Sequence, residues 1–264
     1  MAAHPPLGTR REPLDHPAAG NGRAPVAVVQ ASGISKRYGE GPTAVDALRD
    51  VDITFEEGTF TAIMGPSGSG KSTLLHILAG LERPTRGTAE IAGRELAKLS
   101  DRELTLMRRE EVGFVFQTYN LLPVLTAEEN ITLPLDIGGN PPDRDWLDTL
   151  MRTMGIAERR DHRPDEMSGG EQQRVAVARA LIGRPSVVFA DEPTGNLDSV
   201  SSQEILGLLR HAVDEFSQTI VMVTHDPRAA AVADRVVFLA DGSVVDDRSG
   251  MSVEDILDRL KALG

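Results

Sequence analysis

Cysteine is absent from this chain of 264 residues. The absence excludes disulfide bonds and any zinc or iron–sulfur site built on cysteine, and it suits a reducing compartment. Long apolar runs are also missing: none approaches the ~18–20 residues that a membrane-spanning helix needs. The N-terminus has no apolar core of the kind that marks a signal peptide. We therefore expect a cytoplasmic protein that is peripheral on the inner face of the cell membrane, held there only through a partner.

Basic residues are too few to balance the acidic ones. Lys and Arg number 28 against 40 Asp and Glu, which gives a formal net charge of −12. Nonspecific DNA binding rests on basic residues that face phosphates, so we expect no nucleic acid partner. The apolar fraction of 40% and the charged fraction of 26% are typical of a globular chain with a sizeable core.

Residues 1–25 differ in composition from the rest of the chain. They hold five of the 16 prolines, amid Ala, Gly and Arg. Such a stretch buries too little apolar surface to order itself, so we expect a disordered N-terminal tail, with a short docking segment as the alternative. Residues 26–264 are expected to form a single domain.

The remainder alternates apolar strands with helical patterns. This alternation predicts an α/β fold with a mainly parallel sheet, and the early turn-rich strands predict an antiparallel flank. A helical stripe of apolar residues within 118–166 indicates core packing. Strands are expected at 26–30, 51–55, 59–64, 112–116, 187–190, 219–224 and in a hairpin over 236–246, and helices at 74–79, from Ser168 onward and after Ser252.

The segment Gly65-Pro66-Ser67-Gly68-Ser69-Gly70-Lys71-Ser72-Thr73 lies between an expected strand and an expected helix. It matches the phosphate-loop pattern G-x-x-x-x-G-K-[ST]. The glycines let successive backbone N–H groups point at phosphates, and the following helix adds its positive end. Lys71 is expected to neutralise phosphate charge, and the Ser72 hydroxyl to bind Mg²⁺. The sequence therefore predicts that this loop binds a nucleotide.

Polar residues follow three further strands. Asp191 and Glu192 end one of them, where ligands bind in open α/β sheets. Asp191 is expected to hold Mg²⁺, and Glu192 to act as general base toward the attacking water. His225 and Gln117 follow two other strands. A histidine such as His225 could sense the γ-phosphate, but alone it is more often structural. Gln117 by itself is weak evidence for a contact to Mg²⁺ or the water.

A second anion site is indicated by Met167-Ser168-Gly169-Gly170-Glu171-Gln172-Gln173-Arg174. Ser168 and Glu171 form a capping box, and the two glycines leave N–H groups open at a positive helix end. The plainer interpretation is a well-capped helix. Because one nucleotide does not need two cradles in one chain, we expect a symmetric dimer in which each cradle completes the partner's site.

Taken in order, the phosphate loop, Gln117, MSGGEQQR, VVFADEPTGNLDS and VTHD resemble the ATP-binding subunit of an ABC transporter, over about residues 30–245. Leu-Leu-Pro after Gln117 and the string Pro-Thr-Gly-Asn-Leu-Asp resemble the branch that serves lipoprotein release, macrolide export and the cell-division permease. The segment MSGGEQQR differs at two positions from the commonest form of this motif in the family: Met167 stands in place of leucine, and Glu171 in place of glutamine.

The resemblance implies a P-loop NTPase fold with a nucleotide-binding core at 26–117 and 167–264 and an inserted helical subdomain at 118–166. It implies that Tyr38, 27 residues before Gly65, stacks on adenine, although a plain strand-edge tyrosine is the alternative. Gln117 would couple the nucleotide to the membrane partner, and His225 would sense the γ-phosphate. The contacts implied across the dimer are those of Ser168, Gly169, Gly170 and Asp198.

The function implied is an ATP-hydrolysing subunit that binds two ATP·Mg²⁺ between two copies or paired cassettes and drives a separate permease, with export favoured. Residues 121–125 are expected either to receive that permease or to pack within the helical subdomain. An alternative is a mechanical switch that regulates cell-wall hydrolases through a membrane partner. A translation or DNA-repair ATPase is disfavoured because a second cassette and a long coiled coil are both missing, and the Asn-Lys-x-Asp motif of GTPases does not occur.

Overall fold

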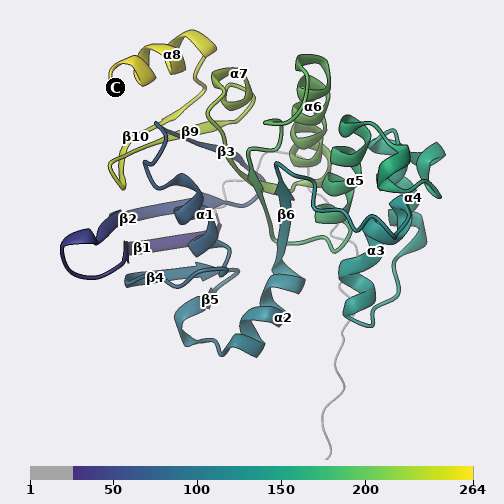
Figure 1. Ribbon diagram of the computed structural model, residues 1–264, viewed down its shortest axis with the longest axis horizontal. Coiled ribbons are helices and arrows are strands. Elements are labelled where there is room, and N and C mark those ends of the chain that lie inside the picture. Colours follow the sequence, from purple (N-terminus) through teal and green to yellow (C-terminus); the bar gives the residue numbers. More distant parts are fainter. Residues whose placement is uncertain (1–25, 264) are drawn as a thin grey trace, which may run out of the picture.

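The computed structural model describes residues 26–263, which form two sheets with helices around them (Figure 1). The expectation for residues 1–25 lies outside the described residues. Within them, no helix is long and apolar enough to cross a membrane. The helices are α1 (Lys71–Leu78), α2 (Asp101–Glu111), α3 (Ala127–Ile137), α4 (Arg144–Thr153), α5 (Gly169–Leu181), α6 (Ser199–Phe216), α7 (Pro227–Ala230) and α8 (Val253–Lys261).

The larger sheet has six strands in the order β10-β9-β3-β8-β7-β6. Neighbours from β9 to β6 are parallel, and only the β9–β10 hairpin is antiparallel. Parallel strands with both faces covered read as continuous apolar runs, as β3 and β8 do, in which every residue is buried. The strands are β3 (Phe60–Met64), β6 (Val112–Phe116), β7 (Val187–Asp191), β8 (Thr219–Val223), β9 (Arg235–Ala240) and β10 (Ser243–Ser249).

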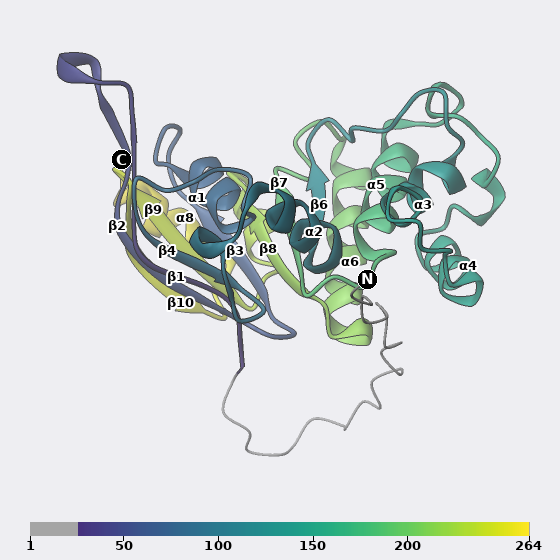
Figure 2. The same cartoon turned by 90° about the horizontal axis from the view of Figure 1, so that it is seen from below.

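The smaller sheet is the predicted antiparallel flank, in the order β2-β1-β4-β5. It comprises β1 (Ala27–Tyr38), β2 (Val45–Glu56), β4 (Arg86–Ile91) and β5 (Arg94–Glu95). The strands β1 and β2 are longer than the sequence indicated, because register shifts interrupt the alternation of their apolar residues. Their connecting turn projects from the body of the molecule (Figure 2).

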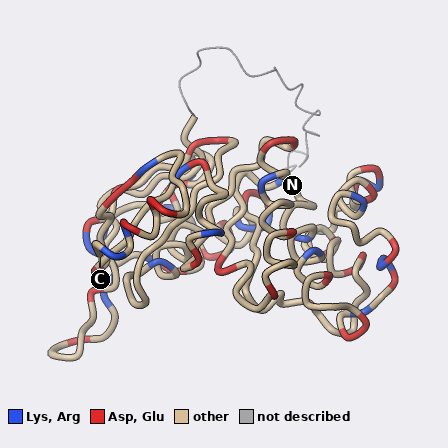
Figure 3. Tube along the Cα trace, turned by 90° about the horizontal axis from the view of Figure 1, so that it is seen from above, with Lys and Arg blue, Asp and Glu red and all other residues tan. Residues whose placement is uncertain are grey.

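The segment 118–166 contains α3, α4 and two short 3₁₀ helices, Ala157–Arg159 (η3) and Pro164–Glu166 (η4). Figures 1 and 2 show these elements beside α5, away from the smaller sheet. The predicted apolar stripe packs inward: Leu147, Leu150 and Met151 are fully buried, while Trp146 is partly buried. Acidic and basic residues are interspersed along the trace (Figure 3), and Arg160, for example, pairs with both Glu128 and Asp148.

Capping boxes begin four of the helices. In each, a Ser or Thr hydroxyl accepts the backbone N–H of the third helical residue, whose carboxylate accepts in return. The four caps are Ser100, Thr126, Ser168 and Ser252. Gly80, after α1, has φ +67°, as predicted for a left-handed helix end. These local signals place the helix starts independently of the sheet.

Candidate nucleotide-binding site

The phosphate loop runs from β3 into α1 in a shape that only glycine permits at two positions. Gly65 has φ +151°, and a Cβ there would lie 1.9 Å from the carbonyl oxygen of Leu239. Gly70 has φ +100°, and a Cβ would lie 2.4 Å from the carbonyl oxygen of Ala47. The loop is therefore pressed against backbone from two distant segments, whereas Gly68 (φ +80°) faces open space.

Lys71 folds over this loop. Its Nζ donates to the carbonyl oxygens of Gly65 at 2.8 Å and Pro66 at 2.9 Å. Burial lowers the pKa of Lys71, while the nearby charges of Glu192 and Asp191 act to raise it. A lysine ammonium held at a glycine-rich loop before a helix N-terminus is suited to bind a phosphate group. The Ser69 hydroxyl is buried in the same loop without a hydrogen-bond partner among the described residues.

A hydroxyl and a carboxylate meet at the carboxyl ends of the strands. Ser72 Oγ, in the first turn of α1, lies 3.4 Å from Asp191 Oδ1 at the end of β7. Burial raises the pKa of Asp191 above its usual range, against the opposing effect of His76. Oxygen ligands of this kind suit Mg²⁺, which takes one or two carboxylates and completes its shell with water and phosphate. The pair therefore fits the metal that accompanies a nucleotide.

Glu192 and His225 come together from adjacent strand ends. Asp191 and Val223 are paired in the β7–β8 ladder, so the residues after them emerge side by side. Oε1 of Glu192 lies 2.8 Å from Nδ1 of His225. Glu192 has φ +47°, and its N–H donates to the carbonyl oxygen of Val223 at 2.9 Å. A non-glycine residue in this region is strained, and such strain concentrates at functional sites.

Gln117 follows β6, whose last residue pairs with Asp191. Its side chain donates to Asn196 Oδ1 at 3.1 Å, and Asn196 donates back to the Gln117 carbonyl at 3.0 Å. A Cβ on Gly195 would lie 2.7 Å from Gln117 Nε2, so glycine makes room for this contact. Gln117 thus lies at the same sheet edge as Asp191 but is held by the loop that follows Glu192.

Ser168, Gly169 and Gly170, here called the second cradle, begin α5. Ser168 N donates to Glu171 Oε2 at 2.8 Å and Glu171 N donates to Ser168 Oγ at 3.2 Å. A Cβ on Gly169 would lie 2.9 Å from the hydroxyl of Tyr119, and one on Gly170 would lie 3.1 Å from Ser201 Oγ.

Asp198 lies beside the second cradle, because Ser201 hydrogen-bonds to it. It caps α6 by accepting from the N–H groups of Val200 and Ser201 at 2.9 and 3.0 Å, and these bonds with the Ser201 hydroxyl lower the pKa of Asp198. The second cradle and Asp198 therefore form one surface.

The two surfaces of one chain that are predicted to bind phosphate are separate. Figures 1 and 2 place α1 and α5 on opposite sides of the β8–β7–β6 part of the sheet. The structure brings Lys71, Ser72, Asp191, Glu192 and His225 to one sheet edge. The second cradle begins α5, on the other side of these strands from α1, and Asp198 follows Glu192 by six residues in the loop that leads to α6.

Tyr38 lies at the end of β1 with 40% of its surface exposed. Its hydroxyl donates to Glu82 Oε2 at 2.6 Å, and Lys36 Nζ lies 2.9 Å from the other oxygen of Glu82 and 5.0 Å from the Tyr38 ring centre. Burial is the largest effect that raises the pKa of Tyr38; the hydrogen bond to Glu82 adds to it, and one with Thr73 opposes it. The ring is thus fixed near the first turn of α1 and keeps an open face.

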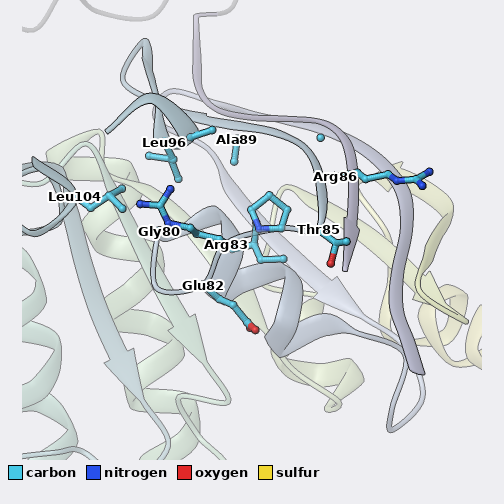
Figure 4. A pocket seen from close by; sticks show the side chains of 12 residues that line it. Gly80, Glu82, Arg83, Thr85, Arg86, Ala89, Leu96 and Leu104 are labelled. Atoms are coloured by element: carbon cyan, nitrogen blue, oxygen red, sulfur yellow. The ribbon is translucent and has the colours of Figure 1, made fainter. Parts of the chain in front are cut away.

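Two hollows lie outside the predicted nucleotide site. One, of about 140 Å³, is lined by the end of α1, by β4 and by α2, and includes Glu82 (Figure 4). The other, of about 270 Å³, lies between β6, α3 and α5, with Phe114, Phe116 and Arg179 in its walls. Neither is lined by a phosphate-loop residue.

This parallel sheet with a phosphate loop after β3 and acidic residues after β7 defines a P-loop nucleotide-binding fold. A family model described as "ABC transporter" matches residues 48–195. The macrolide export ATP-binding/permease protein MacB of Bdellovibrio bacteriovorus is 46% identical over 83% of this chain and 34% of its own length. The bacitracin export ATP-binding protein BceA of Halalkalibacterium halodurans is 44% identical over 83% of this chain and 87% of its own.

Among solved structures, a dimeric post-hydrolysis state of the ATP-binding cassette MJ0796 bound to ADP and Pi is similar, with a TM-score of 0.76. The two sequences are 40% identical, and the match covers 85% of this chain and 99% of the MJ0796 chain. The chain belongs to the ABC transporter family, and its fold is that of the family's ATPase cassettes. It spans about a third of the length of the MacB relatives that it matches.

Three contacts at the site were not predicted from the sequence. They are Asn196 with Gln117, Tyr119 with Gly169, and Arg159 with Glu171. No local pattern signals the first two. For the third, the replacement of the common glutamine by Glu171 was visible as an added charge, but its partner was not.

Proposed function

We propose that this chain is the ATP-binding and ATP-hydrolysing subunit of an ABC transporter, and that it pairs with a second cassette around two ATP·Mg²⁺ to drive a separate membrane permease. The observation that carries the proposal is the separation of two phosphate-binding surfaces on one chain. A two-fold pair places the phosphate loop of each copy opposite the second cradle of the other. The similarity to the dimeric cassette MJ0796 supports this arrangement.

The phosphate loop would bind the nucleotide through its backbone and Lys71. Tyr38 would stack on adenine, and Ser168, Gly169, Gly170 and Asp198 of the partner copy would close the site. Mg²⁺ would be held by Ser72, Asp191 and Gln117, and it supplies charge neutralisation on the β- and γ-phosphate oxygens. The remaining loop contacts would come from Gly65, Ser67, Gly68, Ser69, Gly70 and Thr73.

Glu192 would act as the general base. Its Oε1 is engaged by His225, so Oε2 remains for the water that attacks the γ-phosphate. The water's proton passes to Glu192 as the new P–O bond forms and the bond to ADP breaks. The side chain of His225 is 74% exposed. Its other ring nitrogen, Nε2, would therefore be accessible to the γ-phosphate.

The segment 121–125 would contact the permease. Leu122 and Val124 are 44% and 72% exposed, and Pro123 is exposed between them, whereas Leu121 and Leu125 are half-buried. The segment therefore combines a packed base with an apolar surface of the kind that marks an interface. It begins four residues after Gln117, so movement of the permease would reach the nucleotide site. This contact would hold the chain on the inner face of the cell membrane.

We propose that the transporter exports its substrate, and that this substrate is a lipoprotein, lipid, peptide or drug. The names of the relatives, macrolide export for MacB and bacitracin export for BceA, support export. The identity of the permease would decide among these substrates.

The test is affinity purification of tagged Glu192→Gln chain with ATP from detergent-solubilised membranes. This variant should retain ATP and keep the pair closed, and a multi-span permease should co-elute with it. The matched control is Glu192→Gln with Lys71→Ala, which should lose the ATP-dependent part of the capture. A partner bound to cell-wall hydrolases would favour the mechanical switch, and no membrane protein in either sample would overturn the transporter assignment.

A further inference from the structure

Glu171 carries a full negative charge into the first turn of the helix that begins at the second cradle. Both of its oxygens are engaged: Oε2 accepts from Ser168 N at 2.8 Å, and Oε1 accepts from Arg159 Nε at 2.8 Å. The Glu171 side chain is 18% exposed. The Arg159 hydrogen bond is the largest effect that lowers the pKa of Glu171, to about 2, so the carboxylate is ionised at neutral pH.

A carboxylate at this place has opposing effects. It stabilises α5, because a helix N-terminus favours negative charge. It also repels an anion that approaches the same helix end, because two like charges a few ångströms apart near a protein surface repel each other. A glutamine would satisfy the capping box without that repulsion. This chain therefore needs a positive charge close to Glu171 if its second cradle is to accept phosphate.

Arg159 is the residue placed to supply that charge. It ends η3, in the segment before the cradle, and its NH1 lies 3.4 Å from His162 Nε2. Two neighbouring guanidinium groups pair with other carboxylates: Arg160 pairs with Glu128 and Asp148, and Arg174 pairs with Glu204. Within residues 26–263, Arg159 forms the one ion pair found for Glu171.

We propose that Arg159 is a positioning residue of the second cradle: its ion pair cancels the charge of Glu171 and fixes the capping box, so that the cradle can accept the γ-phosphate held by the partner copy. The inference rests on the proposed function. Because Arg159 belongs to the segment 118–166, a shift of that segment away from α5 would expose the Glu171 charge and weaken the hold on ATP.

The test is a double-mutant cycle on the full chain, with Arg159→Ala, Glu171→Gln and the two combined. The readouts are KM and kcat for ATP hydrolysis, and ATP-dependent dimerisation in a Glu192→Gln background. Arg159→Ala should raise KM by about tenfold, a factor that corresponds to one uncompensated charge near the phosphate. The combined variant should recover most of that loss, because glutamine restores the cap and removes the charge.

Arg152→Ala is the matched control. It removes one positive charge from α4, where Arg152 contacts Thr149 at 3.4 Å and does not touch Glu171. It should leave KM unchanged. If Arg159→Ala lowers the unfolding temperature too far for kinetics, Arg159→Gln replaces it in the cycle, since it keeps a donor without the charge.

A combined variant that keeps the full deficit, or an Arg152→Ala deficit of equal size, overturns this inference alone. A Glu192→Gln chain with Arg159 intact that does not dimerise with ATP overturns the proposed function and this inference with it.

Discussion

Nδ1 of His225 and Oε1 of Glu192 lie 2.8 Å apart, although 33 residues separate them in the chain. Their contact follows from the parallel pairing of β7 with β8, which ends both strands at one edge. The hydrogen bond orients the carboxylate that we propose as general base. The residue proposed to sense phosphate and the residue proposed to activate water are therefore hydrogen-bonded to each other.

Glu192→Gln should keep ATP binding and lose turnover. The amide remains able to hydrogen-bond to His225 but cannot accept the proton of the attacking water. We expect kcat to fall by about 10²–10⁴-fold, the usual contribution of a positioned general base. Steady-state hydrolysis beside ATP affinity by calorimetry checks this, and near-normal turnover would rule out the assignment of Glu192.

His225→Ala should reduce kcat with ATP affinity retained, because it frees Oε1 of Glu192 and removes the group nearest to it. A loss of about 10²-fold or less would fit a residue that orients the base without replacing it. Single-turnover hydrolysis measures the chemical step directly. If His225→Ala were silent, the 2.8 Å contact would be structural only.

Lys71→Ala should weaken nucleotide binding itself. Lys71 is the cation within the phosphate loop, and its loss leaves the phosphate charge with backbone N–H groups alone. Calorimetric titration with ATP and Mg²⁺ should show at least a tenfold increase in Kd, equivalent to about 1.4 kcal/mol. An unchanged Kd would contradict the role of the loop.

Gly65→Ala should disable the phosphate loop, whereas Gly68→Ala should act weakly. A Cβ on Gly65 would overlap the Leu239 carbonyl at 1.9 Å, so the loop must move; a Cβ on Gly68 meets open space. The strain of a left-handed alanine alone costs about 1–3 kcal/mol, which both variants share. Comparing their ATP affinities and unfolding temperatures separates the collision from the strain.

Acid should weaken the fold partly through Glu171. Its pKa in the folded chain is about 2, below the ordinary value of 4.5. The stabilisation is therefore fully present above about pH 4.5 and is lost as pH falls toward 2. The difference in unfolding free energy between the wild type and Glu171→Gln should shrink over that range, as urea titrations at pH 7 and pH 3 would show. Glu254→Gln, on the exposed face of α8, is the matched control for the loss of a carboxylate.

Local chemistry made much of this molecule predictable. The strand Val112–Phe116, the Ser168–Glu171 capping box and the Asp241-Gly242 turn follow from patterns within a few residues, and the structure confirms each. The phosphate loop was predicted because its geometry requires glycine at fixed spacing. In each case, the signal and the structure occupy the same short segment.

Contacts between distant segments could not be predicted in this way. Gln117 meets Asn196 across 79 residues, and nothing in either segment specifies the other. The helix α2 was missed although its Ser100–Glu103 capping box is a local signal. The strand β4, by contrast, was missed because Arg86–Ile91 is short and polar, and becomes a strand through its pairing with β1. Such elements are decided by tertiary packing, which overrides weak local propensity.

The phosphate loop depends on a hairpin formed near the other end of the chain. Gly242 N donates to the carbonyl oxygen of Ser69 at 3.1 Å, and Leu239 lies against Gly65. During synthesis, a nascent chain therefore lacks these contacts to its phosphate loop until the β9–β10 turn has emerged from the ribosome. Fragments that end before residue 235 would contain the whole loop sequence and still lack the backbone that shapes it, so we expect ATP to assist folding only after residues 239–242 have been made.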